Sequence, residues 1–199
     1  MYGQTVFTSS AARLDQLPDD VVREVAFAGR SNAGKSSAIN RLTGNRKLAR
    51  TSKTPGRTQL INHFKVTQGA YLVDLPGYGY ARVSKSQRNQ WHRLLHDYFV
   101  SREQLRCLIV VMDVRHPLTD NDWQMVELQQ QSASSLHVLL TKTDKLSRSQ
   151  ANRSLVKARD ELQSAGVEAS LQTFSASNGE GLKDLVGVLD ENLFEDSAG

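Results

Sequence analysis

The sequence predicts an α/β domain of three layers, in which a mixed, mostly parallel six-stranded sheet with one antiparallel strand lies between helices. Two observations lead to this fold class. Short apolar runs alternate with longer amphipathic stretches, and a glycine-rich loop joins the first of these runs to a helix-compatible stretch. The 199 residues contain no internal repeat and suffice for one domain with its own core. We divide the chain into an N-terminal extension (1–20), the domain (21–194) and an acidic C-terminal tail (195–199).

Six apolar runs have the length and composition of strands. A linker of three residues, Thr67-Gln68-Gly69, separates the second run from the third and is too short for a helical crossover. We therefore expect that pair to be antiparallel and the other strands to be parallel. The single cysteine, Cys107, lies within an apolar run and is expected to be a buried strand residue. The expected strands are Val25–Gly29, Ile61–Val66, Ala70–Asp74, Cys107–Asp113, His137–Thr141 and Ser170–Phe174.

Five amphipathic stretches between or after these runs predict helices. The clearest is the second, because its apolar residues recur at helical spacing and Ser84 with Gln87 forms a capping box at its start. We expect its apolar side chains to be core residues; they are Trp91, Leu94, Leu95, Tyr98 and Phe99. The expected helices are Lys35–Leu42, Ser86–Val100, Asp120–Gln130, Arg148–Ala165 and Leu182–Leu193.

Composition and charge limit the class of protein. No segment approaches the roughly 18 consecutive apolar residues of a membrane span, and the first residues lack the features of a secretion signal. We expect a cytoplasmic protein, a monomer, without a membrane or DNA partner. The net charge of +4 is unevenly distributed, because residues 25–73 contain nine Lys and Arg but no Asp or Glu. This basic half favours a polyanionic partner such as RNA, although a merely soluble basic surface explains the charge equally well.

The loop after the first predicted strand has the pattern G-x-x-x-x-G-K-S. Glycines at its two ends allow backbone N–H groups to approach phosphates, and the following helix adds its N-terminal N–H groups. Lys35 would reach the β- and γ-phosphates, and the Ser36 hydroxyl would bind Mg²⁺. The alternative, a glycine-rich turn without a ligand, is far less common in this context. The residues expected to bind nucleotide here are Gly29, Arg30, Ser31, Asn32, Ala33, Gly34, Lys35 and Ser36.

Two later segments suggest which base is bound. The segment Thr141-Lys142-Thr143-Asp144 follows the fifth predicted strand, and a carboxylate at Asp144 can accept from both guanine N1–H and the exocyclic amine. The aliphatic part of Lys142 can lie over the base. After the sixth strand, Ser175-Ala176-Ser177 could present backbone N–H groups to guanine O6, and the residues expected to contact nucleotide here are Phe174, Ser175 and Ala176. These motifs, in this order, predict a P-loop NTPase of the Ras-like G-domain type that binds GTP and GDP.

Between these motifs lie the segments expected to sense the γ-phosphate. In Asp74-Leu75-Pro76-Gly77, the carboxylate of Asp74 would hold Mg²⁺ through water and the Gly77 N–H would meet the γ-phosphate. A threonine before the second strand would also bind Mg²⁺, but physical reasoning does not choose among Thr51, Thr54 and Thr58.

The motifs G-R-S-N-A-G-K-S, T-P-G-R-T-Q, D-L-P-G-Y-G-Y-A, M-D-x-R-H-P and T-K-T-D resemble those of the bacterial EngB (YihA) family of GTPases, within the TrmE–Era–EngA–EngB group. The resemblance covers roughly residues 20 to 192. It implies that Thr58 is the switch threonine and Mg²⁺ ligand, and that Lys35, Thr58 and Gly77 are the catalytic residues. It also implies a role in assembly of the large ribosomal subunit and in normal cell division and septation. The residues that would contact nucleotide in this segment are Gly56, Arg57, Thr58, Gln59 and Leu60.

Two further expectations concern hydrolysis. Ras-like enzymes orient the attacking water with a glutamine after D-x-x-G, but this chain has Tyr78 there, so we expect slow intrinsic hydrolysis. Asn32 occupies a position that in related GTPases helps to hold K⁺, which suggests K⁺-stimulated hydrolysis; a simple loop hydrogen bond is the alternative. Thr141 stands where the broader GTPase pattern has asparagine, as suits the EngB-like group.

Two classes of function remain open. In the first, the protein is a GTPase whose nucleotide state controls binding to a ribosomal precursor; in the second, it is a regulatory switch for a protein partner of the division machinery, without direct RNA binding. Aromatic and cationic residues after Gly77 would let this loop contact ribosomal RNA, although a polar exposed loop would have the same composition. These residues are Tyr78, Tyr80, Arg82, Lys85 and Arg88.

Overall fold

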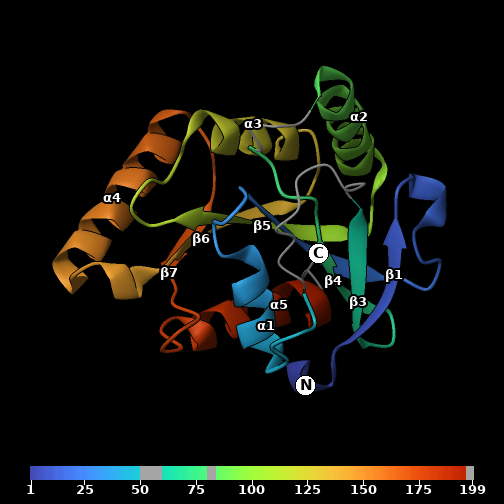
Figure 1. The fold of residues 1–199 in the computed structure, drawn as a ribbon, viewed down its shortest axis with the longest axis horizontal. Helices are drawn as coiled ribbons and strands as arrows, with labels where there is room; N and C mark the ends of the chain where they lie inside the picture. Colours follow the sequence, from blue (N-terminus) through green and yellow to red (C-terminus); the bar gives the residue numbers. More distant parts are fainter. Residues whose placement is uncertain (50–59, 80–83, 196–199) are drawn as a thin grey trace.

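A seven-stranded sheet, in the order β1-β3-β4-β2-β5-β6-β7, runs through the centre of the molecule (Figure 1). The computed structural model describes residues 1–49, 60–79 and 84–195. Strand β3 is antiparallel to both of its neighbours, and the remaining described strands are parallel to one another. The predicted fold class is thus confirmed. The strands are β1 (Val6–Ala11), β2 (Arg23–Gly29), β3 (Ile61–Thr67), β4 (Ala70–Asp74), β5 (Leu105–Asp113), β6 (Ser135–Thr141) and β7 (Ser170–Thr173).

The predicted count of six strands is wrong by one, because β1 adds an edge strand beside β3. Its sequence, VFTSSA, has only a short apolar start, and most of its residues are exposed. An edge strand with one neighbour buries little surface, so it carries a weak apolar pattern. The segment predicted as an N-terminal extension therefore contributes to the same sheet.

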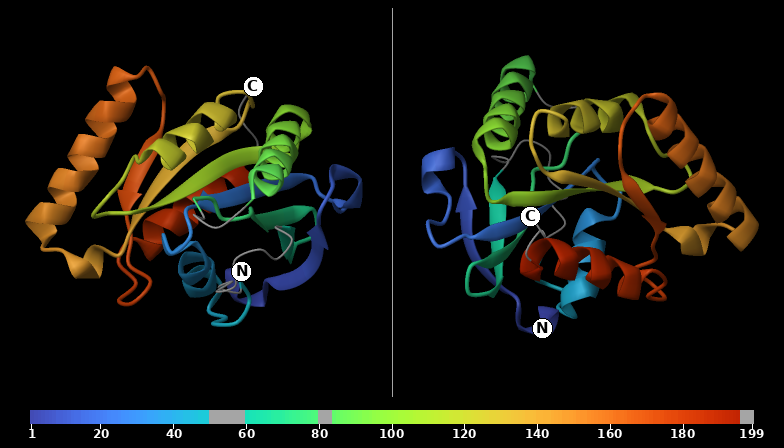
Figure 2. Two further views of the ribbon diagram at one scale, coloured as in Figure 1. Left: turned by 45° about the horizontal axis from the view of Figure 1, so that its top comes forward. Right: turned by 180° about the vertical axis from the view of Figure 1, so that it is seen from behind.

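Helices cover both faces of the sheet, as the views in Figures 1 and 2 show. Side chains from α2, α3 and α4 pack on one face, and side chains from α1 and α5 pack on the other. None of the described helices is both long and apolar enough to cross a membrane. The helices are α1 (Lys35–Thr43), α2 (Lys85–Ser101), α3 (Asp120–Gln129), α4 (Arg148–Ser164) and α5 (Leu182–Phe194), with short 3-10 turns η1 (Tyr2–Gln4), η2 (Leu14–Gln16) and η3 (Thr143–Lys145).

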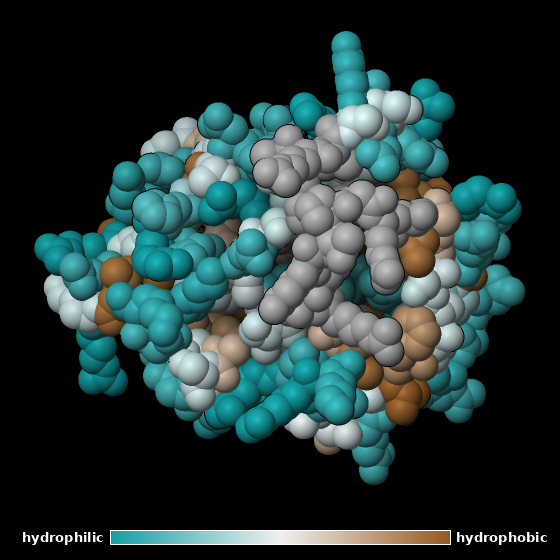
Figure 3. Space-filling view, in the orientation of Figure 1, coloured by the Kyte–Doolittle hydropathy of each residue, from teal (hydrophilic) through white to brown (hydrophobic). Residues whose placement is uncertain are grey.

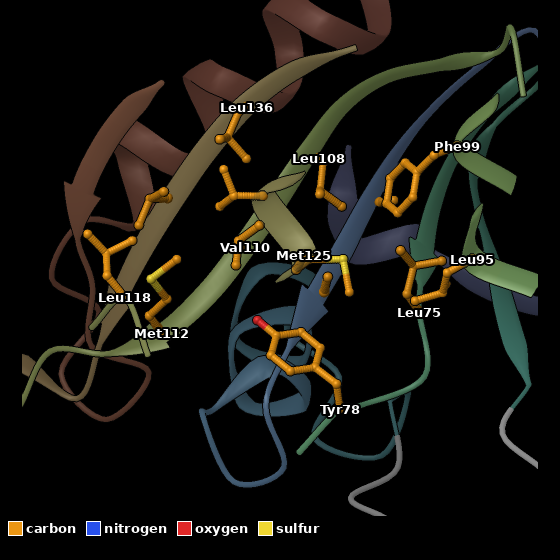
Figure 4. Close-up of a cluster of buried hydrophobic side chains, with 14 of the residues drawn as sticks. Leu75, Tyr78, Leu95, Phe99, Leu108, Val110, Met112, Leu118, Met125 and Leu136 are labelled. Carbon is orange, nitrogen blue, oxygen red and sulfur yellow. The ribbon is translucent and has the colours of Figure 1, made fainter. Parts of the chain in front are cut away.

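Helix α2 confirms the sequence expectations most closely. The Ser84 hydroxyl accepts from the Gln87 N–H at 3.2 Å, which forms the predicted capping box. Three of the predicted core residues are buried and the other two, Trp91 and Leu94, pack partly buried against the same cluster. Figure 4 shows this cluster between the sheet and its covering helices. The fully buried residues of α2 are Leu95, Tyr98 and Phe99.

The parallel strands bring the predicted motifs to one edge of the sheet. Strands β2, β4, β5 and β6 end at Gly29, Asp74, Asp113 and Thr141, and their carboxyl ends lie side by side because the strands pair in parallel. Ligands of open α/β sheets bind at this edge. Cys107 lies inside β5 and is buried, as predicted, and burial raises the pKa of its thiol to about 11.

Candidate functional site

The loop between β2 and α1 requires glycine at both of its ends. A Cβ on Gly29 would lie 2.9 Å from the Val111 carbonyl oxygen, and Gly34 has a φ of +101°. A Cβ on Gly34 would also lie 3.2 Å from Thr141 Oγ1. Gly34 is the N-cap of α1, so the positive end of the helix opens into the loop. This backbone forms a cradle of the kind that receives phosphate groups.

Lys35 and Asp74 form an ion pair beside this loop, and both side chains are largely buried. Lys35 begins α1 and Asp74 ends β4, so two separate elements bring the ammonium and the carboxylate together. With the hydroxyl of Ser36, they supply the cationic and hard-oxygen groups that suit a Mg²⁺-bound phosphate. The predicted residues Gly56, Arg57, Thr58 and Gln59 lie outside the described part of the chain, and Leu60 is half-buried just before β3.

No group of three or more His, Cys, Asp or Glu within residues 1–49, 60–79 and 84–195 could hold a metal ion.

The loops that follow β6 and β7 lie together at the carboxyl edge of the sheet. The Asp144 carboxylate accepts from the Ser175 hydroxyl at 2.7 Å and lies 3.0 Å from the Lys145 ammonium. The bond from Ser175 and then that from Lys145 lower the pKa of Asp144 to about 2, so this carboxylate is ionised at neutral pH. Buried Thr143 donates from its backbone N–H to the Phe174 carbonyl at 3.4 Å. The predicted base-reading segments 141–144 and 174–176 therefore form one unit.

This unit is tied directly to the phosphate loop. The buried Thr141 hydroxyl contacts the Ala33 carbonyl and lies 3.0 Å from the Met112 carbonyl. The Lys142 ammonium donates to the Asn32 carbonyl at 2.6 Å and pairs with Asp113 at 3.0 Å. Threonine at position 141 thus connects the predicted base-reading segment to the backbone of the glycine-rich loop.

Sequence reasoning missed the part played by Asp113, which it placed only at the end of the fourth predicted strand. Asp113 holds Lys142 through one carboxylate oxygen and Arg115 through both, at 2.9 and 2.7 Å. The hydrogen bond from Arg115 is the main reason that its pKa lies well below the ordinary value. The spacing Asp113-x-Arg115 after an apolar strand was the available signal, but the contact to Lys142 depends on how β5 and β6 pair.

Tyr78 departs most from expectation. It was predicted as an exposed aromatic next to cations, but it is only 4% exposed, and Figure 4 shows its ring within the apolar cluster. Its N–H donates to the Gly29 carbonyl at 3.3 Å, and its carbonyl accepts from the Ser31 N–H at 2.9 Å. Its hydroxyl donates to the buried Asp122 carboxylate at 2.9 Å. Tyr78 is therefore unavailable as a surface for stacking bases.

The other residues predicted around Gly77 differ in position. Leu75 and Pro76 are buried, and Gly77 is half-buried before the contact of Tyr78 with the phosphate loop. Lys85 and Arg88 are exposed at the start of α2. Tyr80 and Arg82 lie outside the described residues.

Comparison with known proteins places this site in context. Residues 24–142 match the family model described as "50S ribosome-binding GTPase". Curated relatives named "Probable GTP-binding protein EngB" include one from Vibrio parahaemolyticus, 49% identical over 95% of this chain and 86% of the relative. Another, from Stenotrophomonas maltophilia, is 55% identical over 90% of each chain.

Solved structures support the fold. A crystal structure titled as a probable GTP-binding protein engB is similar with a TM-score of 0.67 and 22% identity, over 84% of this chain and 97% of that one. Era in complex with MgGDPNP and part of 16S ribosomal RNA is similar with a TM-score of 0.61 and 19% identity, over 90% of this chain and 59% of that one. At these identities the likeness concerns the fold alone.

Proposed function

The chain belongs to the EngB family of GTP-binding proteins, and from that premise we propose that it is a Mg²⁺-dependent, slowly hydrolysing GTP switch in assembly of the large ribosomal subunit. A role in normal cell division and septation belongs to the same proposal. The observation that carries the guanine-nucleotide part is the connection between the two loops. Thr141 and Lys142 contact the backbone of the phosphate loop, and Asp144 lies in the 3-10 turn η3 that begins directly after Lys142.

Backbone groups and side chains of the site would then have different parts in nucleotide binding. The backbone of residues 29–36 would hold the phosphates, and the ionised Asp144 would accept from guanine N1–H and its amine. Backbone N–H groups of 175–177 would face guanine O6. Ser36, Thr58 and, through water, Asp74 would hold Mg²⁺, which when bound would neutralise phosphate charge.

Hydrolysis would depend on few groups of this chain. Lys35 would contact the phosphates, and the Gly77 N–H would face the γ-phosphate. Because the Tyr78 hydroxyl is buried against Asp122, it is directed away from solvent and does not replace the water-orienting glutamine of Ras-like enzymes. Asn32 is exposed with a φ of +65°, and we include K⁺ near its side chain in the proposal. Equal turnover in Na⁺ and K⁺ would contradict that part.

Exposed cations support a ribosomal partner. Three cations of the acid-free half, Arg30, Lys35 and Lys65, pair with carboxylates inside the protein, so we do not assign them to an RNA partner. Arg41, Arg46 and Lys47 of the same half are exposed, as are Lys85 and Arg88 at the start of α2. Figure 3 shows a mostly hydrophilic face. The family model that the chain matches is described by 50S ribosome binding. We propose a cytoplasmic monomer that meets the large subunit through these cations: Arg41, Arg46, Lys47, Lys85 and Arg88.

Base recognition is tested by exchanging the carboxylate for an amide. Asp144→Asn should weaken GDP binding by about 10- to 100-fold, since one acceptor for the guanine donors is lost, and should improve binding of xanthosine diphosphate, whose C2 carbonyl can accept from the new amide. Asp160→Asn, an exposed change on α4, serves as the control. Fluorescent-nucleotide titration measures both, and an unchanged GDP affinity in Asp144→Asn would overturn the assignment.

The partner is tested by co-sedimentation with ribosomal particles at two salt concentrations, with GDP or a non-hydrolysable GTP analogue bound. Selective binding to large subunits with the analogue, weaker at higher salt, supports the proposal. Lys85→Ala with Arg88→Ala should then reduce particle binding and leave GDP affinity unchanged. Absence of binding in both states would instead favour a protein partner of the division machinery.

A further inference from the structure

We propose that Asp122 on α3 is a positioning residue for the nucleotide switch: through Tyr78 it holds Gly77 beside the phosphate loop, and so favours GTP over GDP. This inference rests on the proposed function and adds to it a residue outside every motif that the sequence indicated.

The carboxylate of Asp122 is fully buried and is used by several donors. Its Oδ1 accepts from the Tyr78 hydroxyl at 2.9 Å. Its Oδ2 accepts from the Thr119 N–H at 2.9 Å and the Thr119 hydroxyl at 2.8 Å. Thr119 is the N-cap of α3, so these two bonds fix the carboxylate to the start of that helix. Asp122 is thus a rigid acceptor aimed at Tyr78.

Tyr78 is held at both its backbone and its side chain. Its N–H and carbonyl bond to Gly29 and Ser31 in the phosphate loop, and its hydroxyl bonds to Asp122. Gly77 directly precedes it, so fixing Tyr78 also places the Gly77 peptide next to the loop. That is the placement that a contact between the Gly77 N–H and a γ-phosphate requires. GDP lacks this phosphate, so its binding does not depend on the position of Gly77.

Asp122 also faces the phosphate loop through Arg30. Arg30 Nε lies 3.6 Å from Asp122 Oδ2. This nitrogen is buried and has no hydrogen-bond partner among the described residues. Arg30 Nη2 donates instead to the His116 carbonyl at 3.3 Å. One carboxylate therefore faces both the second residue of the phosphate loop and the residue after Gly77.

A tryptophan beside Tyr78 can report on this contact. The ring of Trp91 on α2 packs against the Tyr78 ring with centroids 6.2 Å apart. Trp123 follows Asp122 on α3. A movement of Tyr78 should therefore change the intrinsic fluorescence of the protein.

The molecule provides a matched control in Tyr98. Tyr98 is also fully buried, and its hydroxyl donates to another buried carboxylate, Glu24, at 2.6 Å. That contact lies at the opposite end of β2 from the phosphate loop. Tyr78→Phe and Tyr98→Phe remove the same chemical bond, but only the first removes it next to the candidate nucleotide site.

The experiment compares wild type, Tyr78→Phe and Tyr98→Phe by titration with fluorescent GDP and a fluorescent non-hydrolysable GTP analogue in Mg²⁺. We expect Tyr78→Phe to bind GDP within twofold of wild type and the analogue about tenfold more weakly, with a smaller tryptophan emission change on exchange. Tyr98→Phe should keep both affinities. Asp122→Asn, which keeps the size of the side chain, should change in the same direction as Tyr78→Phe. Thermal unfolding establishes that each variant is folded.

Two results would overturn the inference alone: wild-type discrimination between the nucleotides in folded Tyr78→Phe and Asp122→Asn, or an equal loss of discrimination in Tyr98→Phe. Wild-type protein that binds neither nucleotide would overturn the proposed function, and this inference with it.

Discussion

Two buried carboxylates at opposite ends of β2 have similar partners but different geometry. At the start of the strand, Glu24 accepts from Tyr98 and faces Arg102. Beyond its end, Asp122 accepts from Tyr78 and faces Arg30. In both clusters burial is the main reason that the pKa of the tyrosine lies well above its usual value.

The arginines show the difference. Arg102 bonds to both oxygens of Glu24, at 2.9 and 3.0 Å, and so closes that cluster. Arg30 stays 3.6 Å from Asp122 and keeps a buried N–H without a hydrogen-bond partner among the described residues. Bidentate pairing fixes Arg102 to Glu24, whereas the longer contact holds only the Arg30 guanidinium loosely, since Thr119 and Tyr78 still fix the Asp122 carboxylate. The two clusters thus differ in how firmly the arginine is held, not in how firmly the carboxylate is held.

The largest expected loss of stability comes from removing Arg102 from the cluster around Glu24. Arg102→Met should lower the free energy of unfolding by about 3–5 kcal/mol, because it leaves Glu24 buried without its cation. Urea unfolding measures this. GDP affinity of the folded variant should be unchanged, since the cluster lies at the far end of β2 from the phosphate loop. A loss below about 1 kcal/mol would show that the closed cluster is not a source of rigidity.

The next comparison is between the two tyrosines. Tyr98→Phe and Tyr78→Phe should each lower the free energy of unfolding by about 2 kcal/mol, because each removes one hydrogen bond to a buried carboxylate. Urea unfolding without nucleotide checks this. Equal stability losses together with unequal nucleotide discrimination would sharpen the contrast between the clusters. A much larger loss in Tyr78→Phe would instead make Tyr78 mainly a structural residue.

A third test uses acid. Burial raises the pKa of Glu24, but the neighbouring His63, whose Nε2 lies 3.7 Å from Oε2, the hydrogen bonds and charge of Arg102 and the bond from Tyr98 outweigh it, so this pKa lies below the usual value. The stability from this group is therefore fully present above about pH 4.5 and is lost as pH falls through the lower folded-state pKa. Glu24→Gln should be less stable at pH 7 and should lose less stability than wild type between pH 5 and pH 3. Urea unfolding at several pH values measures this. An equal loss of unfolding free energy in wild type and Glu24→Gln between pH 5 and pH 3 would contradict the assignment.

The smallest effect is expected in the cluster of Asp122, Tyr78 and Arg30, where the ion pair is long. Arg30→Met should lower the free energy of unfolding by less than about 1 kcal/mol, because the Arg30 side chain is 28% exposed and its ion pair is long. Urea unfolding without nucleotide again provides the measurement. A loss as large as that of Arg102→Met would remove the distinction between the two clusters.

Local requirements made much of the site predictable. The phosphate loop could be recognised because Gly34 needs a positive φ and Gly29 needs the absence of a Cβ, and both needs are visible in the residue types. The capping box at Ser84 and the apolar spacing of α2 are likewise properties of neighbouring residues. Helix and strand bounds predicted from such patterns lie within two residues of the observed ones.

Contacts between distant segments were decided by the tertiary structure. Tyr78 and Asp122 are 44 residues apart, Thr141 and Ala33 are 108 apart, and β1 becomes a strand only by pairing with β3. No local pattern distinguishes a tyrosine that will be buried from one that will be exposed after the same glycine. The sequence by itself indicated the loops proposed to hold phosphate and base, because each of them is a short stretch of neighbouring residues. The packing of α3 against the strand ends decided which buried partners hold them, because the energy of a buried carboxylate depends on donors that only the folded chain brings within reach.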